Sequence, residues 1–217
     1  LYLNPQVPAI STFTEVNLKA PLKILSQDRK LIQEYGERLI PITFEQIPKD
    51  FINALLDTED KRFFEHSGID LITVANASWQ LLANAGDIKT GASTITMQVV
   101  KNVSGASEVR FIRKFKEMLL AIKLEQALTK KEILTLYLNI VPFGKHAYGI
   151  QAAAQTYYGK PVSALSLAQM AMLAGIPKAP EAGNPINGPK RALARRPFIS
   201  PPLLCLKVPK RPRGCST

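Results

Sequence analysis

The sequence predicts a mainly α-helical domain that follows a short extended or β segment. Three observations support this fold class. Apolar residues recur at helical spacing from Pro48 onward, two helix starts carry capping-box residues, and no repeated strand–helix alternation or internal repeat occurs. With 217 residues, of which 46% are hydrophobic, the chain is long enough for one sizeable domain with a packed core.

The N-terminal residues 1–47 differ in pattern from the rest of the chain. Short apolar runs such as LKIL and KLIQEYG are separated by Pro and polar turns. Such runs are typical of extended segments or a hairpin. We therefore expect a linker or extended segment over 1–47 and the helical domain over 48–196.

Two apolar stripes predict buried helix faces, because their members recur every three or four residues. The first consists of Ile72, Ala75, Trp79 and Leu82; the second, on a helix expected over about 107–128, consists of Ile112, Phe115, Leu119 and Ile122. Further helix starts are predicted by two capping boxes, Thr129 with Glu132 and Ser166 with Gln169. Gly159 and Gly175 are expected to end helices.

The positive charge of the chain is concentrated at its C-terminal end. The net charge is +11, but eight basic residues follow the last acidic residue, Glu181. The remaining 20 basic and 17 acidic residues leave the body nearly neutral, so no nucleic-acid partner is indicated. Residues 197–217 contain five Pro, both cysteines and no acid. This composition predicts a disordered basic tail, and we consider that the tail is not native to the domain.

No run of about eighteen apolar residues predicts a membrane span. The chain begins with Leu1, which suggests a fragment whose beginning was removed. The body of the chain contains no thiol, which suits an oxidising compartment. No Ser-x-x-Lys nucleophile motif occurs in the sequence, so no transpeptidase activity is expected.

The stretch TEDKRFFEHSGID, residues 58–70, contains the first candidate site. If the helix from Phe51 continues to His66 and ends at Gly68, then Glu59, Phe63 and His66 share one face. A carboxylate beside aromatic rings loses water, which raises its pKa toward the range of a general base. The alternative is an ordinary charged helix end in solvent.

The stretch GASTITMQVVKN, residues 91–102, predicts a helix whose N-terminus Ser93 caps. Its unpaired N–H groups favour an anion, and Lys101 could reach a phosphate two turns further on. A plain Ser-capped helix is the alternative. In RKFKE, residues 113–117, both Arg113 and Lys114 can fold over Glu117; a routine surface ion-pair cluster is the alternative there.

Together these clusters indicate sugar-bond chemistry with a phosphorylated leaving group. Glu59 has an apolar setting and Glu117 a cationic one, and two carboxylates in different environments are typical of such reactions. Lysines near a helix N-terminus favour a leaving group that carries negative charge.

The motifs EDKRFFEHSG, GASTITMQVVKN, RKFKE and KKEILTLYLNIVPFG resemble, in order and spacing, the peptidoglycan glycosyltransferase domain (family 51 transglycosylase) of class A penicillin-binding proteins. The resemblance covers 48 to about 196, and the segment before it resembles the region after the membrane anchor in bifunctional members. It implies a lysozyme-like, two-lobed fold at the periplasmic side of the bacterial cytoplasmic membrane. The implied partners are lipid II, undecaprenyl-pyrophosphate-linked glycan and cell-wall synthesis proteins.

The resemblance also implies roles for individual residues. Glu59 matches the general base for the 4-hydroxyl of lipid II, and Glu117 matches the second glutamate. Residues expected near substrate or pyrophosphate are Lys101, Lys114, Arg113, Ser93, Thr94, Thr96, Gln98 and Asn139. Residues expected to hold the first motif in shape are Asp60, Phe63, His66 and Gly68. No metal ligand is assigned, although a divalent cation such as Mg2+ can assist such a leaving group.

Two positions depart from the family pattern: Met97 stands where a Gln is usual, and Val109 replaces an arginine that Arg110 cannot replace on the same helix face. Two other functions remain open. The first is a lytic enzyme that cleaves glycan, although the cations near the site argue against it. The second is an inactive fragment that binds only lipid-linked precursor or a partner protein; moenomycin binding without turnover would identify it.

Overall fold

The computed structural model describes residues 22–25, 28, 31–35, 38–83, 93–104 and 110–195. The predictions for the tail 197–217 and for most of 1–47 lie outside these residues, and the domain boundaries at 48 and 196 stay predictions. In chain order the described elements are β1 (Leu22–Leu25), β2 (Leu31–Tyr35), β3 (Arg38–Leu39), η2 (Phe44–Gln46), α2 (Lys49–Glu59), α3 (Leu71–Ala83), α4 (Ile95–Ser104), α5 (Arg110–Ala127), α6 (Lys130–Ile140), β4 (Ala147–Tyr148), α7 (Ile150–Tyr158), η3 (Val162–Ala164), α8 (Leu167–Ala174) and α9 (Pro189–Arg195).

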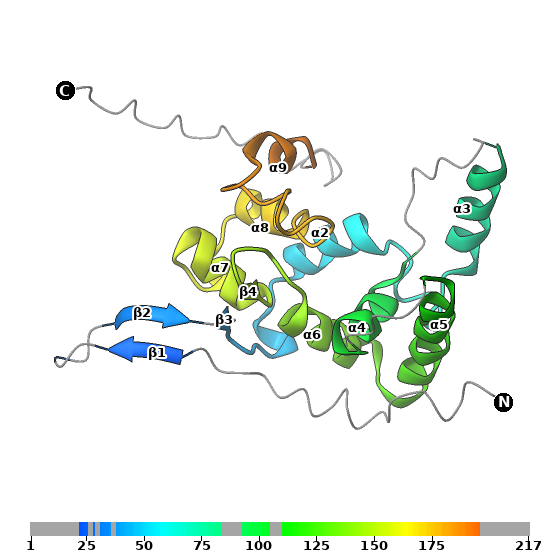
Figure 1. Cartoon of the computed structure of the whole chain (residues 1–217), viewed down its shortest axis with the longest axis horizontal. Helices are drawn as coiled ribbons and strands as arrows, with labels where there is room; N and C mark the ends of the chain where they lie inside the picture. The colour runs from blue at the N-terminus through cyan, green and yellow to red at the C-terminus, as the bar shows by residue number, and fades with distance from the viewer. Residues whose placement is uncertain are drawn as a thin grey trace.

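The predicted mainly helical class with a short β segment is confirmed. Strands β1 and β2 form an antiparallel pair, with Leu22 opposite Tyr35, that lies at one side of the helical body (Figure 1). Strand β3 pairs in parallel with β4, so that Arg38 lies opposite Ala147. This second pair ties the segment after the hairpin to the centre of the domain.

The helical body packs around one hydrophobic core. Helix α2 packs against α8, while α4 packs against both α5 and α6. Fully buried side chains from α2, α4 and α6 meet there, among them Phe51, Leu55, Ile95 and Tyr137. The core therefore joins three helices, α2, α4 and α6, that carry residues of the predicted motifs.

Both predicted capping boxes and the predicted helix ends at Gly159 and Gly175 are confirmed. The side chain of Thr129 accepts from the N–H of Glu132, and that of Ser166 accepts from the N–H of Gln169. Gly159 ends α7 at φ 64°, in the left-handed region that favours glycine. These signals depend on contacts within one turn, which is why sequence suffices to place them.

The predicted burial of the stripe on α3 is wrong where its side chains are described. Ile72 is 60% exposed, Trp79 is 71% exposed, and Ala75 is exposed as well. Helix α3 projects from the body on the side of α5 (Figure 1). An apolar stripe indicates which face of a helix avoids water, but not that its own domain covers that face.

The predicted stripe on α5 is also wrong where its side chains are described, because the buried face of this helix is a different one; the side chain of Ile112 lies outside the described residues. Phe115 is 54% exposed and Ile122 lies at the surface, whereas Leu119 is half-buried. The buried positions of α5 share helical spacing and comprise Glu117, Leu120, Ala121 and Leu124. Packing of α4 against this face fixes the rotation of α5.

Within the described part of the chain, every helix is too short or too polar to cross a bilayer.

Candidate active site

Helix α2 ends at Glu59, not at His66 as the sequence suggested. The next residue, Asp60, leaves the helical conformation at φ −161° and ψ 78°. Its carboxylate accepts from the N–H of Ile95 at 2.9 Å and lies 3.0 Å from His66 Nε2. These two buried contacts pull Asp60 out of the helix, so Glu59, Phe63 and His66 do not share a helix face.

Contacts of His66, Gly68 and Phe63 with other parts of the protein fix the shape of the loop after Glu59. The N–H of Gly68 donates to His66 Nδ1 at 3.2 Å, so the ring hydrogen sits on Nε2 and is donated to Asp60. Gly68 has φ 93°, and a Cβ there would lie 2.7 Å from the carbonyl oxygen of Ala121. Phe63 is fully buried beneath the ammonium group of Lys130, which lies 4.5 Å from its ring centre.

Glu59 is half-buried and is contacted from α4. The amide Nε2 of Gln98 donates to Glu59 Oε2 at 3.1 Å, and the hydroxyl of Tyr137 donates to Gln98 Oε1 at 3.2 Å. Burial raises the pKa of Tyr137 well above its ordinary value, and the charges of Glu59 and Asp60 raise it further. The phenol is therefore protonated and acts as a hydrogen-bond donor.

The start of α4 differs from the prediction in one residue. Thr94, not Ser93, caps the helix: its Oγ1 accepts from the N–H of Met97 at 3.2 Å, and its carbonyl accepts from the N–H of Gln98. Thr94 also donates to the carbonyl of Gly68 at 2.7 Å, which joins α4 to the loop after Glu59. Ser93 is exposed, and its Oγ accepts from Lys114 Nζ at 2.7 Å.

The predicted ion cluster on α5 is confirmed. Glu117 is only 4% exposed, and its carboxylate lies 3.5 Å from Arg113 Nε and 3.3 Å from Lys114 Nζ. The side chain of Lys114 is 41% exposed. A buried carboxylate thus holds two cations whose other sides can meet an anion in solvent.

The remaining predicted residues lie in other settings. Thr96 is fully buried and donates to Glu125 at 2.6 Å. Asn139 exchanges two hydrogen bonds with the backbone of Ile42, at 2.9 and 3.0 Å. Lys101 is exposed and follows Gln98 by three residues, so both lie on one face of α4. The described contact of Thr96 thus joins α4 to α5, and those of Asn139 join α6 to the segment before η2.

The two departures from the family pattern have different outcomes. Met97 is 1% exposed and lies in the hydrophobic core, while Gln98 next to it contacts Glu59. A thioether suits the buried position, and the amide that reaches the site is retained. Val109 and the side chain of Arg110 lie outside the described residues.

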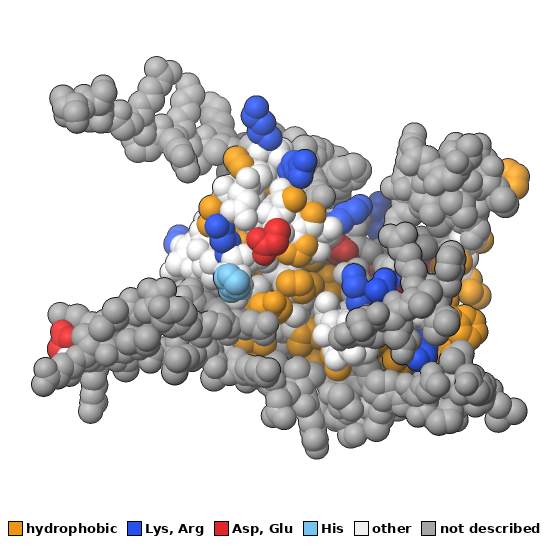
Figure 2. All heavy atoms as spheres, viewed as in Figure 1, with side chains coloured by type: hydrophobic (Ala, Val, Ile, Leu, Met, Phe, Trp, Pro, Cys, Tyr) orange, Lys and Arg blue, Asp and Glu red, His pale blue; other side chains and the backbone are white. Residues whose placement is uncertain are grey.

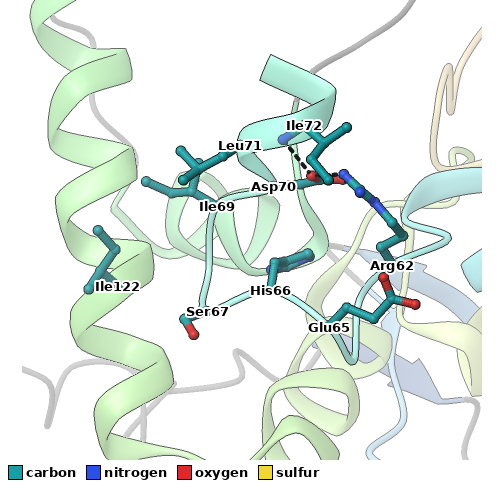
Figure 3. Close-up of a pocket in the computed structure, with 9 residues that line it drawn as sticks. All are labelled: Arg62, Glu65, His66, Ser67, Ile69, Asp70, Leu71, Ile72 and Ile122. Atoms are coloured by element: carbon teal, nitrogen blue, oxygen red, sulfur yellow. Dashed lines mark hydrogen bonds and ion pairs between the residues drawn. The ribbon is translucent and has the colours of Figure 1, made fainter. Parts of the chain in front are cut away.

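Some residues of the site were not found by sequence reasoning. Asp70 caps α3 by accepting from the N–H groups of Ile72 and Thr73, and it forms an ion pair with Arg62 (Figure 3). An Asp directly before an apolar helical run is a helix-start signal that could have identified it. No comparable local signal marks Tyr137, whose partner Gln98 is 39 residues away.

A pocket of 470 Å³ lies next to the loop that follows Glu59. Ile122 of α5 lines it on the side opposite Arg62, and Asp70 lies between them (Figure 3). Its full lining comprises Arg62, Glu65, His66, Ser67, Ile69, Asp70, Leu71, Ile72 and Ile122. His66 therefore joins the pocket to Asp60 and the start of α4.

The family model described as Transglycosylase matches residues 28–201. The chain belongs to the transglycosylase family. The predicted family is confirmed, and with it a peptidoglycan glycosyltransferase domain of the penicillin-binding proteins.

Transglycosylase relatives share much of this sequence. Penicillin-binding protein 1A of Pseudomonas aeruginosa is 52% identical over 200 residues, which is 92% of this chain and 24% of that protein. Penicillin-binding protein 1A of Escherichia coli K12 is 47% identical over 199 residues, or 91% and 23% of the two chains. A crystal structure of penicillin-binding protein 1A from Haemophilus influenzae aligns with a TM-score of 0.49 and 29% identity, over 84% of this chain and 18% of that chain. The chain spans about a quarter of the length of these curated relatives.

The positive charges described at the site come from the side chains of Arg113 and Lys114. Both oxygens of Glu117 face Arg113 or Lys114. Among the described residues, no group of three or more His, Cys, Asp or Glu side chains is placed to hold a metal ion. The involvement of Mg2+ therefore stays a prediction.

Proposed function

We propose that this transglycosylase domain polymerises lipid II into glycan strands. Glu59 accepts the proton of the 4-hydroxyl of the lipid II acceptor, and that oxygen attacks the anomeric carbon of the growing glycan. The bond to undecaprenyl pyrophosphate breaks, the pyrophosphate leaves with the electron pair, and the linkage inverts from α to β. A carboxylate in a partly desolvated setting suits the role of general base.

One observation carries this proposal. The start of α4 and the residue before its cap contact both the proposed base and the cation cluster: Gln98 contacts Glu59, and Ser93 contacts Lys114. Asp60, next to Glu59, accepts from the N–H of Ile95 in the same turn. A proton acceptor and a cation cluster are thus tied to one short segment, as transfer from a pyrophosphate requires.

The cations stabilise the negative charge of the leaving group. Lys114 and Arg113 are oriented by Glu117 and remain partly exposed, so each can donate to a pyrophosphate oxygen. Lys101 lies on the same face of α4 as Gln98 and supplies a further positive charge. A glycan-cleaving enzyme has a sugar hydroxyl as its leaving group, so this cluster favours synthesis over lysis.

Exposed apolar side chains support contact with the membrane that carries the lipid substrate. They lie on α3, on α5 and in the loop before α3, and comprise Phe64, Leu71, Ile72, Trp79, Phe115 and Ile122. Figure 2 shows hydrophobic side chains at the edge of the molecule where α5 lies. Such a grouping is typical of a membrane or protein contact surface. We place it at the outer face of the cytoplasmic membrane.

The test is polymerisation of labelled lipid II by the chain and its Glu59→Gln variant. Polymer from the unsubstituted chain and a loss of at least about 100-fold in the variant are expected, because general-base catalysis contributes that much. Glu45→Gln, which changes an exposed carboxylate in η2 away from this loop, is the control and should retain activity.

Other outcomes of this assay select another function. Shortening of preformed glycan without new polymer would indicate the lytic enzyme. Moenomycin binding without turnover would indicate a chain that only binds precursor. Full activity of a folded Glu59→Gln variant would exclude Glu59 as the base.

A further inference from the structure

Tyr137 lies in the core and is linked to the proposed base through the side chain of Gln98. Its side chain on α6 is fully buried, and its hydroxyl donates to Gln98 Oε1 at 3.2 Å. The other end of the same amide, Nε2, donates to Glu59 Oε2 at 3.1 Å. One hydrogen-bonded chain therefore runs from α6 through α4 to the end of α2.

The direction of this chain is set by which groups can donate. A carboxylate accepts hydrogen bonds and an amide has one accepting and one donating end. Rotating the Gln98 amide by half a turn would place its oxygen against the oxygen of Glu59, with two acceptors facing each other. A buried phenol that retains its proton favours the amide oxygen on its own side.

We propose that Tyr137 is a positioning residue that orients Glu59 through the side-chain amide of Gln98. The inference rests on the proposed function, because Glu59 is oriented for a proton transfer. Donation from Nε2 keeps Oε2 in place, so the carboxylate is held in one orientation. An amide that rotates would provide this donor for only part of the time.

The positioning role of Tyr137 can be tested separately from its contribution to core packing. Phenylalanine fills the volume of Tyr137 but lacks the hydroxyl, so Tyr137→Phe removes the donor and leaves the core filled. Gln98→Ala removes the amide and leaves Tyr137 in place. If Tyr137 acts only through Gln98, its substitution should have no further effect once the amide is absent.

The experiment measures steady-state lipid II polymerisation by the full chain, Tyr137→Phe, Gln98→Ala and the double variant. Each single variant is expected to lose about tenfold in kcat with KM changed less than twofold, because an interaction with the base acts on the chemical step. The double variant should match Gln98→Ala. Tyr157→Phe is the control: its hydroxyl also donates to a partly buried acceptor, the carbonyl of Phe143, and its kcat should be unchanged.

Several results would overturn the proposal. An unchanged kcat in Gln98→Ala or in a folded Tyr137→Phe would do so, as would a double variant whose losses multiply. If Tyr137→Phe does not fold, the Gln98→Ala result still decides, since that variant keeps the core.

A readout independent of activity separates this proposal from the proposed function. In nitrogen-15 NMR, the side-chain amide of Gln98, assigned by its loss in Gln98→Ala, should exchange with solvent more slowly in the unsubstituted chain than in Tyr137→Phe. Equal exchange rates would overturn the positioning role. Absence of polymer from the unsubstituted chain would overturn the proposed function, and the exchange rates would still test the orientation of the amide.

Discussion

The carboxylate of Asp60 accepts the N–H of Ile95 at 2.9 Å and so fastens the end of α2 to the first turn of α4. The two residues are 35 positions apart, and both are buried. The same carboxylate accepts from His66. One side chain thus sets where Glu59 lies relative to the helix that carries Gln98.

Asp60→Ala should therefore destabilise the domain by about 2 to 3 kcal/mol, since it leaves two buried donors without their acceptor. Asp60→Asn should cost less, because one amide oxygen can still accept from Ile95. Urea unfolding of Asp60→Ala, His66→Ala and the double variant measures the coupling between the two side chains. A coupling energy near zero would show that the contact between Asp60 and His66 contributes nothing to folding.

Glu117→Gln should lower the rate of polymerisation while it lowers the free energy of unfolding only modestly. The substitution removes the negative charge that holds Lys114 and Arg113, so both cations lose their fixed direction toward a pyrophosphate. Because both cations are partly exposed and can hydrate again, the stability loss should be about 1 to 2 kcal/mol. Turnover and urea unfolding are measured on the same sample. Glu45→Gln, which changes an exposed carboxylate in η2, is the control; equal activity of Glu117→Gln and this control would contradict the orienting role.

Local signals predicted several parts of this site, and tertiary contacts determined the others. The cluster of Arg113, Lys114 and Glu117 lies within one turn of α5, so spacing was sufficient to predict it. The contact of Gln98 with Glu59 joins residues 39 positions apart and depends on where the end of α2 lies relative to α4. Spacing within a helix does not contain that information.

The same limit explains the errors in the predicted helix and stripes. The end of α2 at Glu59 is decided by the distant N–H of Ile95, so the charged run after it gave no indication of the break. On α5, a buried Glu117 marks the inner face, whereas apolar Phe115 points outward. A pattern that assigns charged residues to solvent selects the wrong face here, because the site requires a buried carboxylate.

Asp70→Ala should weaken the start of α3 at neutral pH but not in strong acid. The Arg62 guanidinium, together with hydrogen bonds from Thr73, holds the pKa of Asp70 well below its ordinary value of 3.8. A lowered pKa means that the carboxylate stabilises the folded state above about pH 4 and that this stabilisation is lost as the pH falls through the lowered value. The loss of a cap costs about 1 kcal/mol.

Hydrogen exchange at the amides of Ile72 and Thr73 measures this effect locally. Exchange in Asp70→Ala should be faster than in the unsubstituted chain at about pH 6, and the difference should shrink below about pH 4. Asp50→Ala, which changes an exposed acid in the first turn of α2, should leave α3 unaffected. A difference that stays constant down to about pH 2 would contradict the ionic cap.

Substituting apolar residues on α3 and α5 should reduce binding to lipid vesicles. Trp79→Glu and Phe115→Glu each place a charge where the proposed membrane surface lies, and burying a charge in the interface is costly. Sedimentation with vesicles containing anionic lipid should show weaker binding of both variants. Ile186→Glu, at an exposed apolar residue in the segment before α9, should bind as the unsubstituted chain does. Equal binding by all four proteins would place the membrane contact elsewhere.

The loss of folding stability caused by Tyr157→Phe should become smaller at alkaline pH. Partial burial raises the pKa of Tyr157 above its ordinary value of 10.0, and Glu181 raises it further. In the unfolded chain this phenol ionises near about pH 10, while in the folded chain it stays neutral, so its contribution is fully present below about pH 10 and is lost as the pH rises through the folded value. At about pH 8 the variant should be less stable by about 1 kcal/mol, because the carbonyl of Phe143 loses its donor. Urea unfolding from about pH 8 to about pH 11.5 should show this difference shrinking above about pH 10; a constant difference would mean that Tyr157 ionises equally in the folded and unfolded chains.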